Sequence, residues 1–235
     1  MSLRTLAASL FLALASAAAQ AGPVEDMAAF ERVYIPALAL TNQPQAPAER
    51  VAGSLSRLSA SWPGLRAAFS GKDEPLEKAL RITDTALAQA GQLLAQGKRA
   101  EAHDALEGVR LAFFEARRGA GIELYVDRLT EFHDAMEELV KAAQAGAPRA
   151  QLEPLLREAS ELWSRAELPA FDAALFGFDA KKDVELRGRL QGERDTLEAL
   201  RAAVASGDAA RTRELAGQLK GRFGQIYAMF GDFGG

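Results

Sequence analysis

Good helix formers dominate this chain from Pro23 onward, and this constrains its fold more than any other feature. Ala, Leu, Glu, Gln and Arg supply most of the stretch, and no run rich in Val, Ile and Thr alternates with period two as a β-strand would. The prediction is therefore an all-α fold. Short breaks with glycine or proline divide the sequence into about eight helical segments, expected at 24–41, 47–69, 74–96, 98–118, 123–145, 148–176, 181–206 and 208–230.

The breaks between these segments are only a few residues long, for example at 96–98, 119–121 and 206–208. Short connections force neighbouring helices to run antiparallel, so we expect an antiparallel helical bundle. Prolines inside the helical patterns should kink or interrupt their helices, and these are Pro36, Pro63 and Pro169.

The spacing of aromatic residues indicates an internal duplication. The first half has Phe30, Trp62, Pro63 and Phe69, and the second has Phe132, Trp163, Pro169 and Phe171. Further along, Asp84, Gly97, Arg110 and Phe113 match Asp195, Gly207, Lys220 and Phe223. The pattern favours two tandem four-helix units, residues 22–120 and 121–235. Chance resemblance between helices rich in Ala and Leu is the alternative.

Residues 1–21 have the layout of a secretory signal peptide. Arg4 precedes an apolar run from Leu6 to Ala15, and the segment ends in the small-residue pattern Ala19-Gln20-Ala21. The run is shorter than the roughly 20 apolar residues that a membrane-spanning helix needs. We therefore expect an exported protein that does not span the membrane. The absence of cysteine favours a bacterial periplasm over a eukaryotic extracellular space.

Charge and composition exclude several classes of function. Removal of residues 1–21 takes away Arg4 and no acidic residue, which changes the net charge from −4 to −5. Such a balance argues against nucleic acid as a partner, because nucleic acid requires a clustered basic face. A chain without cysteine can form neither disulfides nor a c-type haem attachment. No phosphate-binding loop or nucleophile motif is present, so the sequence indicates a protein that is not an enzyme.

The only two histidines lie in near-identical strings of five residues. His103 begins the string His-Asp-Ala-Leu-Glu, which ends at Glu107, and His133 begins His-Asp-Ala-Met-Glu, which ends at Glu137. Histidine and glutamate four residues apart share one face of a helix. If the chain reverses near 119–122 and packs helices 98–118 and 123–145 side by side, the two strings lie next to each other.

This arrangement predicts a transition-metal site made of His103, Glu107, His133 and Glu137. Helix pairs that supply His and Glu at such spacings hold metals in bundle proteins, and a mixed nitrogen and oxygen set suits copper, iron or zinc. His133 lies within an apolar stripe, so its replacement should weaken binding more than that of His103. The alternative is that His133 is a core histidine and that the pairs are surface ion pairs, each contributing about 0.3 kcal/mol.

Two functions follow from these readings. The first is an exported helical-bundle protein that binds a transition metal for storage, buffering or delivery. The second is a structural or interaction module without metal, whose helix faces engage a protein partner in the cell envelope. Metal content of the purified protein, with and without the two histidines, separates them.

Overall fold

The computed structural model describes residues 22–167 and 171–234. Within these ranges the chain is all-helical, as predicted, and contains no strand. The helices are α1 (Pro23–Thr41), α2 (Ala48–Phe69), α3 (Glu74–Ala95), α4 (Arg99–Gly119), α5 (Tyr125–Gln144), α6 (Arg149–Glu167), the 3-10 helix η1 (Ala173–Phe176), α7 (Ala180–Ser206) and α8 (Ala209–Ala228).

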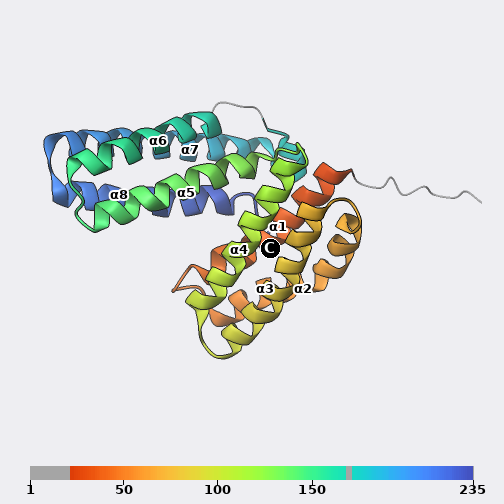
Figure 1. The fold of residues 1–235 in the computed structure, drawn as a ribbon. Helices are drawn as coiled ribbons and strands as arrows, with labels where there is room; N and C mark the ends of the chain where they lie inside the picture. The colour runs from red at the N-terminus through yellow and green to blue at the C-terminus, as the bar shows by residue number, and fades with distance from the viewer. Residues whose placement is uncertain (1–21, 168–170, 235) are drawn as a thin grey trace, which may run out of the picture.

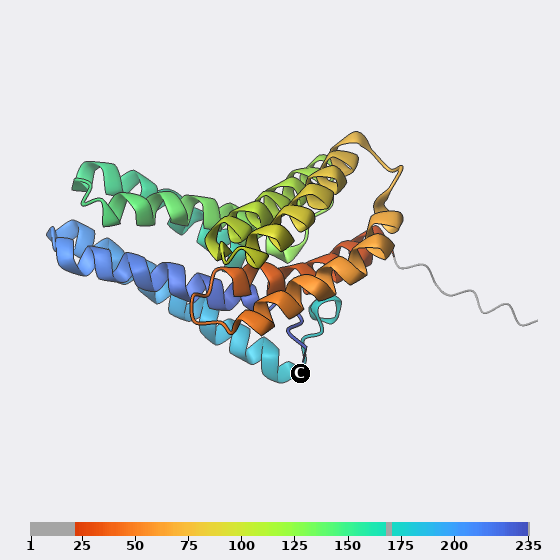
Figure 2. The same cartoon turned by 90° about the horizontal axis from the view of Figure 1, so that it is seen from below.

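The helices form two arms that meet at an elbow (Figure 1, Figure 2). In the first arm α1 packs against α2 and α4, and α3 packs against the same two helices. In the second arm α5 and α7 each pack against both α6 and α8. Contacts between the arms involve α1 with η1 and α8, and the end of α4 with the start of α5.

Local signals in the sequence place several helix ends. The carboxylates of Asp73, Asp179 and Asp208 accept backbone N–H groups at the starts of α3, α7 and α8, which satisfies donors that the first helical turn leaves free. Gly97 lies between α3 and α4 with φ +74°, a conformation that glycine adopts at little cost. This turn fixes where α4 begins, and therefore the height of His103 one turn later.

The predicted helix over 148–176 is too long. α6 ends at Glu167, and Asp172 then caps the separate 3-10 helix η1. The residue before a proline is disfavoured in the α region, which is consistent with an end close to Pro169. The kink predicted at Pro169 lies outside the described residues, and so does the predicted signal peptide over residues 1–21. Pro36 and Pro63 do not interrupt their helices, since α1 and α2 are continuous through them.

The expectation that α4 and α5 pack side by side is wrong beyond their connecting turn. α4 lies along α3 and α1, whereas α5 lies along α6 and α8, and the two helices diverge from the elbow (Figure 1, Figure 2). Most contacts of α4 and of α5 are with helices of their own arm. Both His-containing strings nevertheless line one pocket between the arms.

A buried ion-pair cluster joins the arms at the elbow. Arg117 of α4 is 1% exposed and donates to Glu31 of α1 at 2.8 Å and to Asp127 of α5. Asp127 also accepts the backbone N–H of Leu124 at the start of α5. One guanidinium thus fixes three helices and the turn between α4 and α5.

None of the helices in the described ranges is long and apolar enough to cross a bilayer.

Candidate functional site

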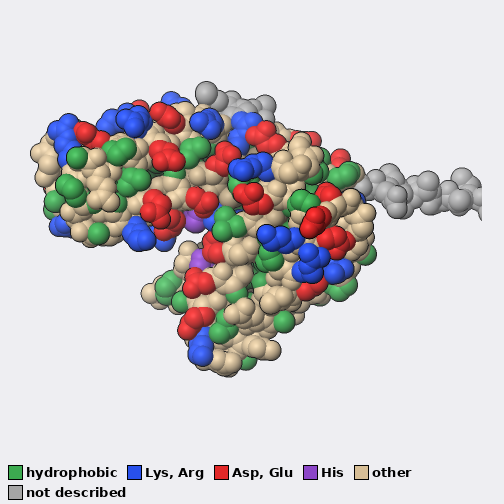
Figure 3. Space-filling model, viewed as in Figure 1, with side chains coloured by type: hydrophobic (Ala, Val, Ile, Leu, Met, Phe, Trp, Pro, Cys, Tyr) green, Lys and Arg blue, Asp and Glu red, His purple; other side chains and the backbone are tan. Residues whose placement is uncertain are grey.

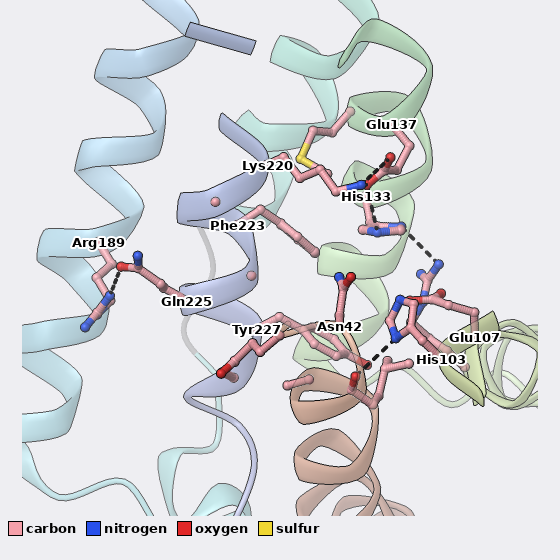
Figure 4. A pocket seen from close by; sticks show the side chains of 18 residues that line it. Asn42, His103, Glu107, His133, Glu137, Arg189, Lys220, Phe223, Gln225 and Tyr227 are labelled. Atoms are coloured by element: carbon pink, nitrogen blue, oxygen red, sulfur yellow. Dashed lines mark hydrogen bonds and ion pairs between the residues drawn. The ribbon is translucent and has the colours of Figure 1, made fainter. Parts of the chain in front are cut away.

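A pocket of about 660 Å³ lies on the inner side of the elbow. The space-filling view shows both histidines, in purple, at the notch between the arms (Figure 3). Side chains from α1, α4, α5, α7 and α8 line it, so both arms contribute (Figure 4). The polar lining residues are Asn42, Gln43, His103, Glu107, Arg110, His133, Glu137, Arg189, Lys220, Gln225 and Tyr227.

His103 lies between the end of α1 and Glu107. Its Nδ1 lies 3.2 Å from the carbonyl oxygen of Leu38 and 3.3 Å from the hydroxyl of Thr41, and the tautomer with its proton on Nδ1 donates to that carbonyl. In the neutral ring Nε2 then holds a lone pair, and it lies 3.5 Å from Oε1 of Glu107. A histidine whose Nδ1 donates to a backbone carbonyl is oriented as metal-ligating histidines usually are.

Glu107 divides its two oxygens between different partners. Oε2 accepts from Nε of Arg110 at 2.8 Å, whereas Oε1 lies 3.5 Å from Nε2 of His103. The contact with Arg110 fixes the carboxylate without using the oxygen next to His103. His103 and Glu107 therefore form a pair of adjacent nitrogen and oxygen donors. A contact with Leu38 orients the histidine, and a contact with Arg110 orients the carboxylate.

His133 is arranged in the opposite way. Its Nδ1 lies 3.0 Å from Nη2 of Arg110, which only donates, and 3.3 Å from Oδ1 of Asp134, which only accepts; a neutral ring with its lone pair on Nδ1 accepts from Arg110. In the neutral ring the proton then resides on Nε2, which lies 3.6 Å from Oε1 of Glu137. His133 would have to lose this proton or turn its ring before Nε2 could bind a metal.

Glu137 is also occupied. Nζ of Lys220, on α8, lies 2.8 Å from its Oε1 and 3.0 Å from its Oε2 (Figure 4). Both oxygens thus face the ammonium group, and one of them faces the N–H of His133 as well. The pair on α5 is therefore bound to protein groups, whereas the pair on α4 keeps one donor atom of each residue free.

The structure brings all four predicted ligands to one pocket but does not close them around one point. In the ranges that it describes, no cluster of three or more His, Asp or Glu side chains is arranged to hold a metal ion. Arg110 stands between the two pairs, because it contacts Glu107 on one side and both His133 and Asp134 on the other.

Sequence analysis missed Arg110 and Lys220 as site residues. Both had a signal, since the predicted duplication places them at matching positions, and each pairs with the carboxylate of one His/Glu string in the structure. An arginine or lysine within a helix is ordinarily a solvated side chain, so position in the repeat alone gave no reason to place either in a pocket.

Burial and neighbouring groups set the charge state of the pocket residues. Burial acts to lower the pKa of Arg110, but the charge and hydrogen bond of Glu107 together with Tyr227 and Tyr34 outweigh it, and the pKa lies further above its ordinary range. Burial raises the pKa of Tyr227 well above 10, so this lining residue keeps its hydroxyl proton. The pocket therefore holds a permanent cation next to the free donor atoms of His103 and Glu107.

Comparison of the chain with protein-family models, with curated proteins and with solved structures finds no match.

Proposed function

We propose that this chain is an exported helical-bundle protein that binds a divalent transition metal, copper, iron or zinc, for storage, buffering or delivery. The observation that supports this most is the pairing of His103 Nε2 with Glu107 Oε1 at 3.5 Å in a pocket open to solvent. Zinc–ligand bonds of 2.0–2.1 Å in tetrahedral geometry place two ligand atoms about 3.4 Å apart. The pair therefore needs almost no rearrangement to share one ion.

We also propose that the two arms are tandem four-helix units from a duplication, α1–α4 and α5–α8. Equivalent aromatic residues of the two repeats support this. In the first arm the ring centroid of Phe30 lies 4.2 Å from that of Phe113 and 5.8 Å from that of Trp62. In the second arm the ring centroid of Phe132 lies 5.7 Å from that of Phe223 and 4.7 Å from that of Trp163. Export is supported by the sequence of residues 1–21, and the periplasm by that segment together with the absence of cysteine.

His103→Ala is expected to lower the affinity for metal at least tenfold, whereas His133→Ala should lower it less than threefold. This order reverses the one expected from the apolar stripe around His133, because Arg110 and Lys220 engage His133 and Glu137, whereas Nε2 of His103 and Oε1 of Glu107 contact only each other among the described side chains. Calorimetric titration of apo protein with copper(II), zinc and iron(II) measures both effects. Binding should also weaken in mildly acidic solution, where a histidine ligand takes up a proton.

The matched control is Gln43→Ala, which removes a polar lining side chain without either donor atom. Equal affinities of wild type and His103→Ala would contradict the proposal. In that case the interaction module without metal becomes the better account of the fold.

A further inference from the structure

We infer that the pocket takes its metal as a complex with a small di- or tricarboxylate rather than as a bare ion. This inference rests on the proposed function and specifies its cargo. Three features of the pocket lead to it: the number of donor atoms that the protein offers, the charge already present, and an unpartnered guanidinium nitrogen.

The protein offers too few donors for a bare ion. Tetrahedral sites need four ligands, and the pair on α4 supplies two. The pair on α5 is engaged by Arg110 and Lys220. The remaining positions on the metal must be filled from outside, by water or by a chelator. A pocket of about 660 Å³ is of the size that holds small organic ligands and far exceeds the needs of one ion.

The charge of the pocket favours a complex as well. Its two carboxylates, Glu107 and Glu137, are already paired with Arg110 and Lys220. A bare divalent ion would add two positive charges that no free carboxylate neutralises, which is costly in a partly buried site. A metal that carries two or three carboxylates of its own arrives neutral or slightly negative, and so avoids this cost.

Arg110 supplies the binding group for such a carboxylate. Its side chain is 5% exposed and lines the pocket. Nε and Nη2 have partners, but Nη1 is buried and has none among the described residues. A buried charged donor without a partner is costly, and carboxylate is the acceptor that a guanidinium binds best. The same residue thus fixes Glu107 toward the metal and leaves one nitrogen for the chelator.

Citrate is the probe for this inference. Apo protein is incubated with copper(II) chloride alone, with citrate alone, and with equimolar copper(II) and citrate, and the bound species are then weighed by native mass spectrometry. We expect a complex of one protein, one copper and one citrate in the third mixture. Copper occupancy should be at least tenfold lower without citrate, and citrate should not be retained without copper.

Two variants make the result specific. Arg110→Gln should lose the ternary complex, whereas Arg187→Gln, which removes an exposed arginine on α7, should keep it. Circular dichroism shows whether Arg110→Gln folds, and the wild-type mixtures decide the matter if it does not. Copper retained equally with and without citrate overturns the inference and leaves the proposed metal site intact. Copper retained in neither mixture refutes both.

Discussion

Arg117→Met is expected to destabilise the protein by about 3–5 kcal/mol at neutral pH, the usual effect of removing one partner from a buried ion pair. The substitution leaves Glu31 and Asp127 facing each other without a counter-charge, and both are buried. Burial already raises the pKa of Glu31, and Arg117 is the main influence that lowers it. Without Arg117 that pKa rises further, so part of the lost stability should return in acid, where Glu31 takes up a proton.

Thermal or urea unfolding followed by circular dichroism measures this loss. Arg118→Met is the matched control, because Arg118 is the next residue along α4 and its side chain is 66% exposed, so its removal should cost less than about 0.5 kcal/mol. The triple variant Glu31→Gln, Arg117→Met and Asp127→Asn should recover much of the loss, since no unpaired charge remains. An Arg117→Met variant as stable as wild type would show that the cluster does not hold the elbow.

The stability of the wild-type protein should decline as the pH rises, and Glu193→Gln should remove this decline. Glu193 of α7 is fully buried, neither of its carboxylate oxygens has a partner among the described residues, and burial raises its pKa to about 8 from an ordinary 4.5. The folded protein therefore keeps a proton that the unfolded chain releases. The associated stability is fully present below pH 4.5 and is lost as the pH rises through about 8.

The difference between the two pKa values corresponds to roughly 3–5 kcal/mol of unfolding free energy lost between acidic and alkaline solution, at 1.36 kcal/mol for each pKa unit. Urea unfolding at pH 5, 7 and 9 should show that Glu193→Gln is more stable than wild type at pH 9 and little different at pH 5. Glu198→Gln on the exposed face of the same helix should follow the wild-type curve. A wild-type stability that stays constant from pH 5 to pH 9 would contradict the assignment.

The helices could be predicted from sequence because their signals are local. The composition of helix formers, the glycines at turns and the aspartates at helix starts all act within a few residues, and the structure has its helices close to the predicted ranges. The long helix over 148–176 was wrong because the sequence pattern did not separate α6 from η1, which begins with the cap at Asp172.

Local sequence signals could not predict how α4 and α5 are oriented relative to each other. A short turn fixes that the chain changes direction, but the angle depends on which helices cover each apolar face, and that depends on the whole fold. Sequence analysis therefore predicted that the two His/Glu strings lie close together, but not how their side chains are arranged. It did not predict the contact of Arg110 on α4 with His133 on α5. The two helices diverge, and the long side chain of arginine spans the distance between them.

The most direct test of the account is the number of imidazole nitrogens bound to copper(II) in the loaded protein, read by electron spin echo envelope modulation. The arrangement of His103 and Glu107 predicts one imidazole, with a signal that persists in His133→Ala and disappears in His103→Ala. Two equivalent imidazoles would show that His133 gives up its contact with Arg110 to bind the metal. No imidazole signal in wild-type protein would contradict the metal site altogether.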